Sequence, residues 1–110
     1  MLVVTTEAIA GHRVVATLGL VADSALRSRG IGGNIMAGLA GLHALNGDAL
    51  AEFRASLDAT RDEAIARMAA RATGLGANGV LGLRIETAPV GHDMSEVVAY
   101  GTAVVIEPTP

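Results

Sequence analysis

The chain has 110 residues, 51% of them apolar, with a formal net charge of −3 and no cysteine. This length indicates a single domain, residues 1–110, and the lack of cysteine excludes disulfides and thiolate metal sites. The negative charge, with one Phe, one Tyr and no Trp, argues against a nucleic-acid-binding surface. The apolar content exceeds what a small two-layer domain usually buries, so we expect contacts between subunits of an oligomer.

The N-terminal part is predicted to form two strands. Residues 2–5 are β-prone, residues 7–11 favour a turn, and residues 13–22 alternate with a period of two. One face of this second strand, formed by Val14, Ala16, Leu18 and Leu20, is fully apolar, as expected for a sheet with one face on a core. The N-terminus lacks the charged and apolar regions of a signal peptide, so we expect a cytoplasmic protein of prokaryotic type.

Residues 31–45 carry no charge and predict a short glycine-rich helix. Large apolar residues recur at helical spacing, and small residues form a second row at every fourth position, which would let another backbone approach closely. The segment is shorter than the roughly 20 residues that span a bilayer, so we expect an interfacial helix. A helix lying on a membrane surface is the alternative, although flanking Lys, Arg and Trp are missing. The expected interface residues are Gly33, Ile35, Ala37, Leu39 and Gly41.

A long helix is predicted from the turn at residues 46–48 to Thr73, with Gly74 or Gly76 as its stop. Glu63 and Arg67 are spaced to form an ion pair on it. Its apolar stripe consists of Leu50, Phe53, Leu57, Ala64, Met68 and Leu75, with Thr60 as the one polar member.

Two further strands are predicted after this helix, over residues 80–86 and 97–107, with a loop at 88–93. In the first of them, strict alternation places Leu81, Leu83 and Ile85 on one face. Both strands are almost wholly apolar, and therefore they indicate a fold more clearly than a chemistry.

These last elements resemble the YbjQ family, which is functionally uncharacterised and is labelled a heavy-metal-binding domain. The resemblance covers nearly the whole chain and is strongest at residues 75–85 (Leu-Gly-Ala-Asn-Gly-Val-Leu-Gly-Leu-Arg-Ile) and 100–106 (Tyr-Gly-Thr-Ala-Val-Val-Ile). Residues 3–6 and 19–21 fit the opening strands of the family. The resemblance implies a two-layer α+β subunit of order β-β-α-β-β, with a mostly antiparallel sheet, in a ring-like homopentamer. It implies no demonstrated enzyme activity.

The middle of the chain departs from the family pattern. Members carry Gly-Glu-Ala after the second strand, then an Arg-Asp pair and a Gly-Gly-Arg before the long helix. Here the corresponding stretches read Asp-Ser-Ala at 23–25, Ala-Gly at 37–38 and Asn-Gly-Asp at 46–48. The charged groups expected to line a shared site are therefore largely replaced.

A divalent metal ion is the cofactor that the family label suggests. The best candidate ligands are His92 and Asp93 in the predicted loop, with Glu86 and Glu96 able to approach across the hairpin. An exposed polar turn explains these residues equally well. His43 stands alone in the uncharged helix, where it is either a satisfied histidine or, in a ring, part of a pH-responsive cluster.

A small anion is the second ligand that the sequence suggests. Glycines at the start of the predicted short helix, with two arginines beside them, could offer backbone N–H groups to an anion. The spacing matches neither a dinucleotide fingerprint nor a phosphate-binding loop, and turn-forming glycines are the alternative explanation. The candidate residues are Arg27, Arg29, Gly32, Gly33 and Asn34.

No serine lies in a nucleophile motif and no carboxylate pair stands out, so we assign no catalytic residue. The sequence favours a structural or binding module, a homo-oligomer that binds a metal ion or small anion at subunit boundaries. The alternative is a small-molecule enzyme whose active site lies between subunits, and convergence of Arg27, Arg29, His92 and Asp93 would favour it. No protein partner other than the chain itself is indicated.

Overall fold

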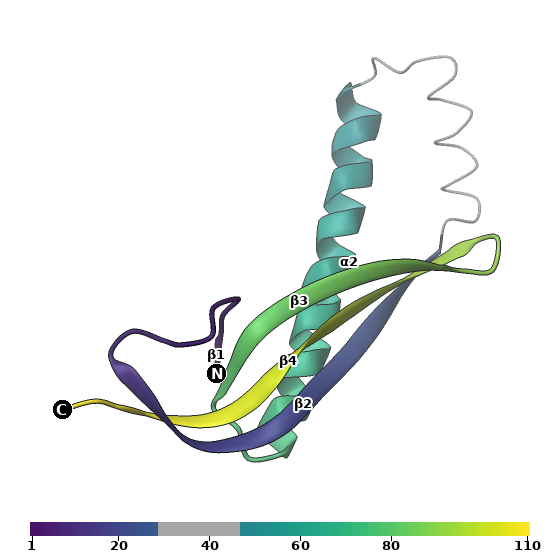
Figure 1. Ribbon diagram of the computed structural model, residues 1–110. Helices are drawn as coiled ribbons and strands as arrows, with labels where there is room; N and C mark the ends of the chain where they lie inside the picture. The colour runs from purple at the N-terminus through teal and green to yellow at the C-terminus, as the bar shows by residue number, and fades with distance from the viewer. Residues whose placement is uncertain (29–46) are drawn as a thin grey trace.

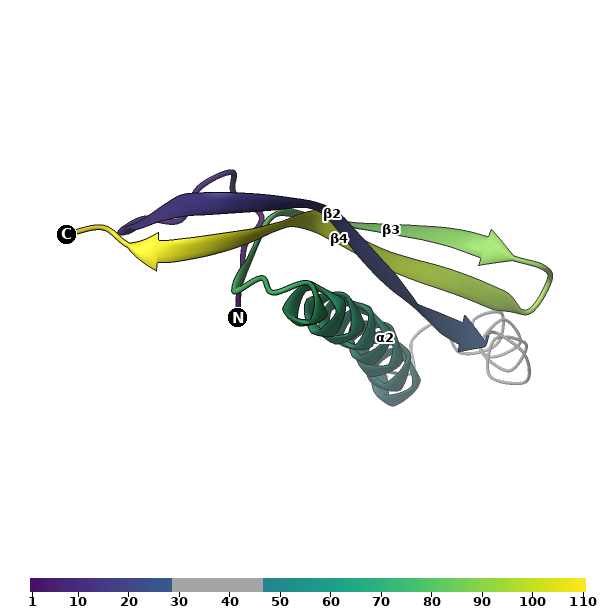
Figure 2. The same cartoon turned by 90° about the horizontal axis from the view of Figure 1, so that it is seen from below.

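The computed structural model describes residues 1–28 and 47–110, which form a four-stranded sheet with one helix packed on one face (Figure 1). Strands β1 (Leu2–Val3) and β2 (His12–Ser28) precede helix α2 (Gly47–Gly74), and strands β3 (Gly79–Val90) and β4 (Met94–Pro108) follow it. The α+β class is confirmed, with helix and sheet as two layers (Figure 2). The short helix expected over residues 31–45 lies outside the described residues.

The sheet has the strand order β1-β3-β4-β2 and is mixed. Strand β1 runs parallel to β3, whereas β3 and β2 both run antiparallel to β4, so the sheet is mostly antiparallel. The N-terminal segment continues beside β3 after β1 ends. The Val4 N–H donates to the Val80 carbonyl at 2.9 Å, and the Leu83 N–H donates to the Val4 carbonyl at 2.9 Å.

The strands are longer than the sequence pattern predicts. Strand β2 continues past Ala22 to Ser28, so Asp23 and Arg27 lie within a strand rather than in a connection to a helix. Strands β3 and β4 likewise extend their hairpin until only residues 91–93 remain as the turn. Polar residues in these extensions interrupt the apolar alternation from which the strands were predicted. Their interaction partners lie on distant elements, so a local sequence pattern does not indicate them.

A β-bulge interrupts β3. The register between β3 and β4 slips between Leu81 and Arg84, where Gly82 and Leu83 together oppose Gly101. Gly82 has a φ of +65°, which a glycine adopts without the steric cost that other residues meet there. The bulge therefore rotates the remainder of β3 relative to its first residues.

This rotation corrects the expected placement of the apolar residues in β3. Val80 is fully buried in the cluster beneath the helix, and Leu83 and Ile85 pack against the same cluster. Leu81 instead joins a smaller cluster with Val104 on the opposite face, which we call the open face. Leu81 therefore does not share a face with Leu83 and Ile85, because the bulge adds a residue between them.

Helix α2 packs on the sheet through its C-terminal half, while its N-terminal half extends past the sheet (Figure 1). The predicted stripe is confirmed at Ala64, Met68 and the polar Thr60, all of which are buried. Leu50 and Leu75, which were predicted to belong to it, are 46% and 55% exposed. Within the described parts of the chain, no helix is long and apolar enough to cross a membrane.

The connection from α2 to β3 is held by Asn78. Its Nδ2 donates to the Ile106 carbonyl at 2.8 Å, and its Oδ1 accepts from the Ile106 N–H at 2.7 Å. The side-chain amide thus exchanges two hydrogen bonds with the backbone of β4, as a neighbouring strand would. Asn78 therefore extends the sheet by one position where the chain leaves the helix.

Asp23 connects the sheet to the helix. Its carboxylate lies 3.1 Å from Arg71 Nε and 3.7 Å from Arg67 Nε, and Arg67 also reaches Glu63 at 3.9 Å, as the helical spacing predicts. The Ser24 backbone N–H donates to Asp23 Oδ1 at 2.7 Å and is the main reason why the pKa of Asp23 lies below its ordinary value. The two arginines lower this pKa further, whereas partial burial acts in the opposite direction.

Replacing Gly101 with Ala should destabilise the fold. A Cβ there would lie 2.7 Å from Val80 Cγ1 and 2.8 Å from the Leu81 carbonyl oxygen, and the second of these is backbone that cannot move aside without disturbing the bulge. We expect urea denaturation to show a loss of about 1–3 kcal/mol. Gly74→Ala is the matched control, because a Cβ at this helical position meets nothing within 4 Å. Equal stability of the two variants would contradict the packing described for β3 and β4.

The ion pairs of Asp23 should make stability depend on acid. A folded-state pKa below the unfolded value contributes stability above the unfolded pKa, about pH 4, and the contribution disappears as pH falls through the folded pKa. Asp23→Asn should therefore lower the Tm at neutral pH and reduce the fall in Tm between neutral and acidic pH. Asp62→Asn, at an exposed helical carboxylate, serves as the control. Parallel Tm profiles for wild type and Asp23→Asn would show that these contacts do not stabilise the fold.

Candidate functional site

The residues predicted to bind an anion are only partly within the described chain. Arg27 lies near the end of β2, where its Nε donates to Ser56 Oγ of α2 at 3.3 Å. Its predicted companions Arg29, Gly32, Gly33 and Asn34 lie outside the described residues. The same holds for His43 and for the expected interface residues Gly33, Ile35, Ala37, Leu39 and Gly41.

The four predicted metal ligands lie along the β3–β4 hairpin. His92 and Asp93 form part of the turn, while Glu86 opposes Val98 and Glu96 opposes Ala88 two cross-strand pairs nearer the turn. The two glutamates share the open face because successive cross-strand pairs alternate between faces. In residues 1–28 and 47–110, no three or more His, Asp or Glu side chains gather as a metal would require. One subunit therefore does not bring these four residues together as a site.

Glu86 instead pairs with Tyr100. The Tyr100 hydroxyl donates to Glu86 Oε1 at 3.0 Å. This hydrogen bond is the main cause of a raised pKa for Tyr100, with burial and the negative charge of Glu86 acting in the same direction. Arg84, which opposes Tyr100 across the strands, lowers it.

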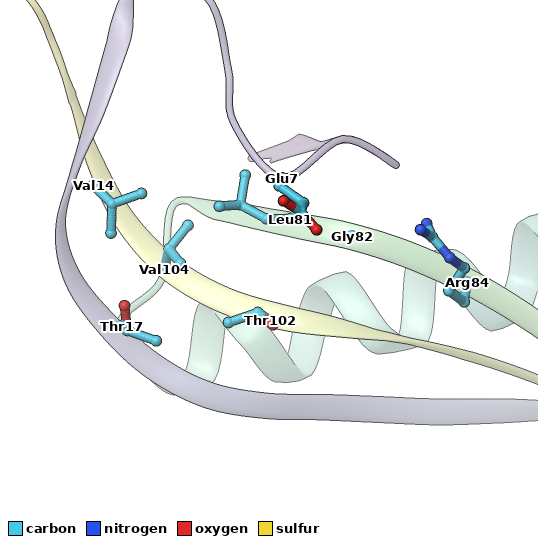
Figure 3. Close-up of a pocket in the computed structure, with 8 residues that line it drawn as sticks. All are labelled: Glu7, Val14, Thr17, Leu81, Gly82, Arg84, Thr102 and Val104. Carbon is cyan, nitrogen blue, oxygen red and sulfur yellow. The ribbon is translucent and has the colours of Figure 1, made fainter.

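A depression on the open face is a candidate site built from described residues. It has a volume of about 460 Å³, within the usual range for small-molecule sites, and it opens on the side of the sheet away from α2 (Figure 3). Three strands and the N-terminal loop contribute to it. The lining residues are Glu7, Val14, Thr17, Leu81, Gly82, Arg84, Thr102 and Val104.

The floor of the depression is apolar and belongs to the core. Leu81 and Val104 are 9% and 1% exposed and belong to the smaller core cluster, against which Val4 and Ile9 of the N-terminal segment pack. Leu81 reaches this face only because of the bulge that follows it. The floor is therefore part of the packed core rather than a mobile surface.

The bulge also positions the N-terminal loop at the rim. The Gly82 N–H donates to the Thr6 carbonyl at 2.9 Å, and this bond holds the backbone directly before Glu7. The Thr6 hydroxyl donates to the Ala8 carbonyl at 2.6 Å and tightens the turn around Glu7. Glu7 consequently lies over Gly82 and Leu81 at the edge of the depression (Figure 3).

Arg84 supplies the positive charge of the depression. Its Nη1 donates to the carbonyls of Leu83 at 2.8 Å and Thr5 at 3.1 Å, which anchors one nitrogen of the guanidinium on the backbone. No ion pair joins Arg84 to Glu7 or to another carboxylate of the described chain. The depression therefore presents a cation and an anion on an apolar floor, an arrangement suited to binding.

Sequence reasoning did not identify this depression. Its lining comes from four segments that are far apart in the sequence, and no local motif unites them. The available signal was Gly82, because a glycine inside an apolar strand often marks a bulge or the close approach of another backbone. Arg84, the only basic residue of the same strand, was a second indication.

Comparisons with known proteins place the whole chain in one group. A family model described as "YbjQ_1: Putative heavy-metal-binding" matches residues 1–107. A UPF0145 protein of Bradyrhizobium sp. (strain ORS 278) is 44% identical over 108 residues, which cover 98% of this chain and 95% of that protein. A UPF0145 protein of Dehalococcoides mccartyi (strain ATCC BAA-2266 / KCTC 15142 / 195) is 43% identical over 107 residues, covering 97% of this chain and all of that protein.

A solved structure supports the fold. The crystal structure of a protein of unknown function from Pediococcus pentosaceus ATCC 25745, which belongs to the DUF74 family, superposes with a TM-score of 0.61. The two chains are 20% identical, and the match covers 97% of this chain and 98% of the other. At this identity the similarity supports the architecture alone.

The Tyr100–Glu86 hydrogen bond gives a direct test of the open face. Tyr100 is the only tyrosine and the sequence has no tryptophan, so the absorbance of tyrosinate on alkaline titration reports this one residue. Because Glu86 raises the pKa of Tyr100, Glu86→Gln should move the titration to lower pH. Glu96→Gln, on the same face but without a hydrogen bond to Tyr100, should leave it unchanged. A titration unaffected by Glu86→Gln would show that this hydrogen bond is absent in solution.

Proposed function

The chain belongs to the YbjQ family, whose relatives carry the name UPF0145, and on this basis we propose that it is a cytoplasmic homo-oligomeric binding module. The proposal takes the oligomer to be the ring-like homopentamer that the resemblance implied. The observation that supports it most is the amount of apolar side chain left exposed along one strand.

Strand β2 lies at the edge of the sheet and carries this apolar surface. Leu20 is 76% exposed, although burying a large aliphatic side chain lowers the free energy of the protein. Exposed edges of long strands with apolar residues are prone to pair with other chains, and specific assembly is one way in which proteins cover them. The other exposed apolar residues of β2 are Val14, Val15, Leu18 and Leu26.

A ring is compatible with this surface because the two edge strands of the sheet differ. The edge at β2 extends over 17 residues, whereas the opposite edge is covered by the two residues of β1 over only part of β3. An interface between two unlike surfaces is heterologous, and repeated heterologous contacts close into a ring when the rotation allows it. The open-face depression would then lie beside the subunit boundary, because Leu20 opposes Thr102 of its lining.

The heavy-metal description of the family does not fit the described residues of a single subunit. Soft metal ions prefer thiolate ligands, and the sequence contains no cysteine. The described residues also provide no group of three His, Asp or Glu side chains. We therefore assign no metal to the subunit. A site that joins His92, Asp93, Glu86 and Glu96 of neighbouring copies stays a prediction, which zinc titration of the assembled protein would test.

Native mass spectrometry of the untagged protein tests the assembly, and a five-subunit mass is expected. Leu20→Arg should shift the population toward monomers, because it places a charge in the proposed apolar contact, where an unpaired charge costs several kcal/mol. Ala66→Arg adds the same side chain at an exposed position of α2 and should leave the mass unchanged. A monomeric wild type would refute the oligomer, and a Leu20→Arg pentamer would exclude β2 from the interface.

A further inference from the structure

We infer that the open-face depression binds a small zwitterion, with a carboxylate on Arg84, an ammonium group on Glu7 and a short aliphatic body on the apolar floor beside Glu7. This inference rests on the proposed binding function and names the ligand class. Every group that it uses belongs to one subunit, so it does not depend on the number of copies in the assembly.

The two charges define the ligand. Elsewhere in the described chain, Arg13 forms an ion pair with Glu107 and Arg71 forms one with Asp23. Glu7 and Arg84 line one depression and form no such pair. Since only Nη1 of Arg84 donates to backbone carbonyls, the other N–H groups of its guanidinium can donate hydrogen bonds to a carboxylate.

The geometry disfavours a simple polyanion. Glu7 and Arg84 line the same depression, so a phosphate bound at Arg84 would be repelled by the carboxylate of Glu7 (Figure 3). A molecule that carries one positive group satisfies both side chains at once. The depression therefore selects for a paired arrangement of charges over negative charge alone.

The floor sets the character of the rest of the ligand. The apolar part of the lining lies on the side of Glu7 away from Arg84 (Figure 3). Leu81 and Val104 form its floor at 9% and 1% exposure, and Val14 beside them is 45% exposed. Thr17 and Thr102 add hydroxyl groups at the β2 side of the lining. A branched aliphatic body of a few carbons would cover the floor, which makes leucine the simplest probe of this class.

Isothermal titration calorimetry with three matched compounds tests the inference. Leucine carries both charges, 4-methylpentanoate lacks the ammonium group, and 3-methylbutylamine lacks the carboxylate. We expect leucine to bind saturably with a Kd of about 1 mM or lower, and each analogue to bind about tenfold or more weakly. Inorganic phosphate should bind more weakly than leucine.

Variants locate the binding to the depression. Glu7→Gln and Arg84→Lys should each weaken leucine binding about tenfold or more, because each replaces one charge-assisted contact. Glu7→Gln should also reduce the advantage of leucine over 4-methylpentanoate. Arg61→Ala removes an exposed arginine of α2 and should leave binding unchanged. Arg84→Lys is preferred to Arg84→Ala because a lysine keeps the positive charge beside the Thr5 carbonyl, and circular dichroism verifies that each variant is folded.

Several outcomes would overturn the inference. These are the absence of saturable heat with leucine, equal binding of leucine and 4-methylpentanoate, tighter binding of phosphate, or unchanged binding in folded Glu7→Gln and Arg84→Lys. Native mass spectrometry of the same samples separates this test from that of the proposed function. A pentamer that does not bind leucine refutes the ligand class alone, whereas a monomer that binds it refutes the assembly alone.

Discussion

The close packing of the Gly82 bulge in β3 against Gly101 in β4 is the constraint on which the rest of this structure depends. Gly101 has no Cβ, and only for this reason can the Leu81 carbonyl and the Val80 side chain occupy their positions. The bulge requires in turn a residue that tolerates a φ of +65°. Two glycines on neighbouring strands thus allow one strand to change faces in the middle of a sheet.

Both faces of the sheet use this change. On the helix side, Val80 and Leu83 flank the bulge and pack in or against the main core, which also contains Met68 of α2. On the open face, Leu81 joins Val104 and forms the floor of the depression. The bulge also directs the Gly82 N–H outward, where it bonds to the N-terminal segment and holds the loop that carries Glu7. Core and candidate site are therefore two results of one backbone irregularity.

Much of the architecture could be predicted from the sequence, because periodicity and turn residues are local properties. They predicted the element order, the long helix with Gly74 or Gly76 as its stop, and the strands after it, and α2 ends at Gly74. The extension of β2 to Ser28 could not be predicted in this way, since Arg67 and Arg71, which pair with Asp23 there, lie far away in the sequence on α2. The depression depends on contacts between distant segments, and the family resemblance provided no ligand residues for it.

The placement of charge distinguishes the two faces. On the helix side, Asp23 is paired with two arginines, so its charge contributes to holding the layers together. On the open face, Glu86 bonds to Tyr100, whereas Glu7 and Arg84 stay apart over an apolar floor. Charges that stabilise a fold are usually paired or fully solvated. Glu7 and Arg84 are both exposed, so water compensates their charges while no ligand is bound, and the ligand inferred above would replace this water with its own complementary pair of charges.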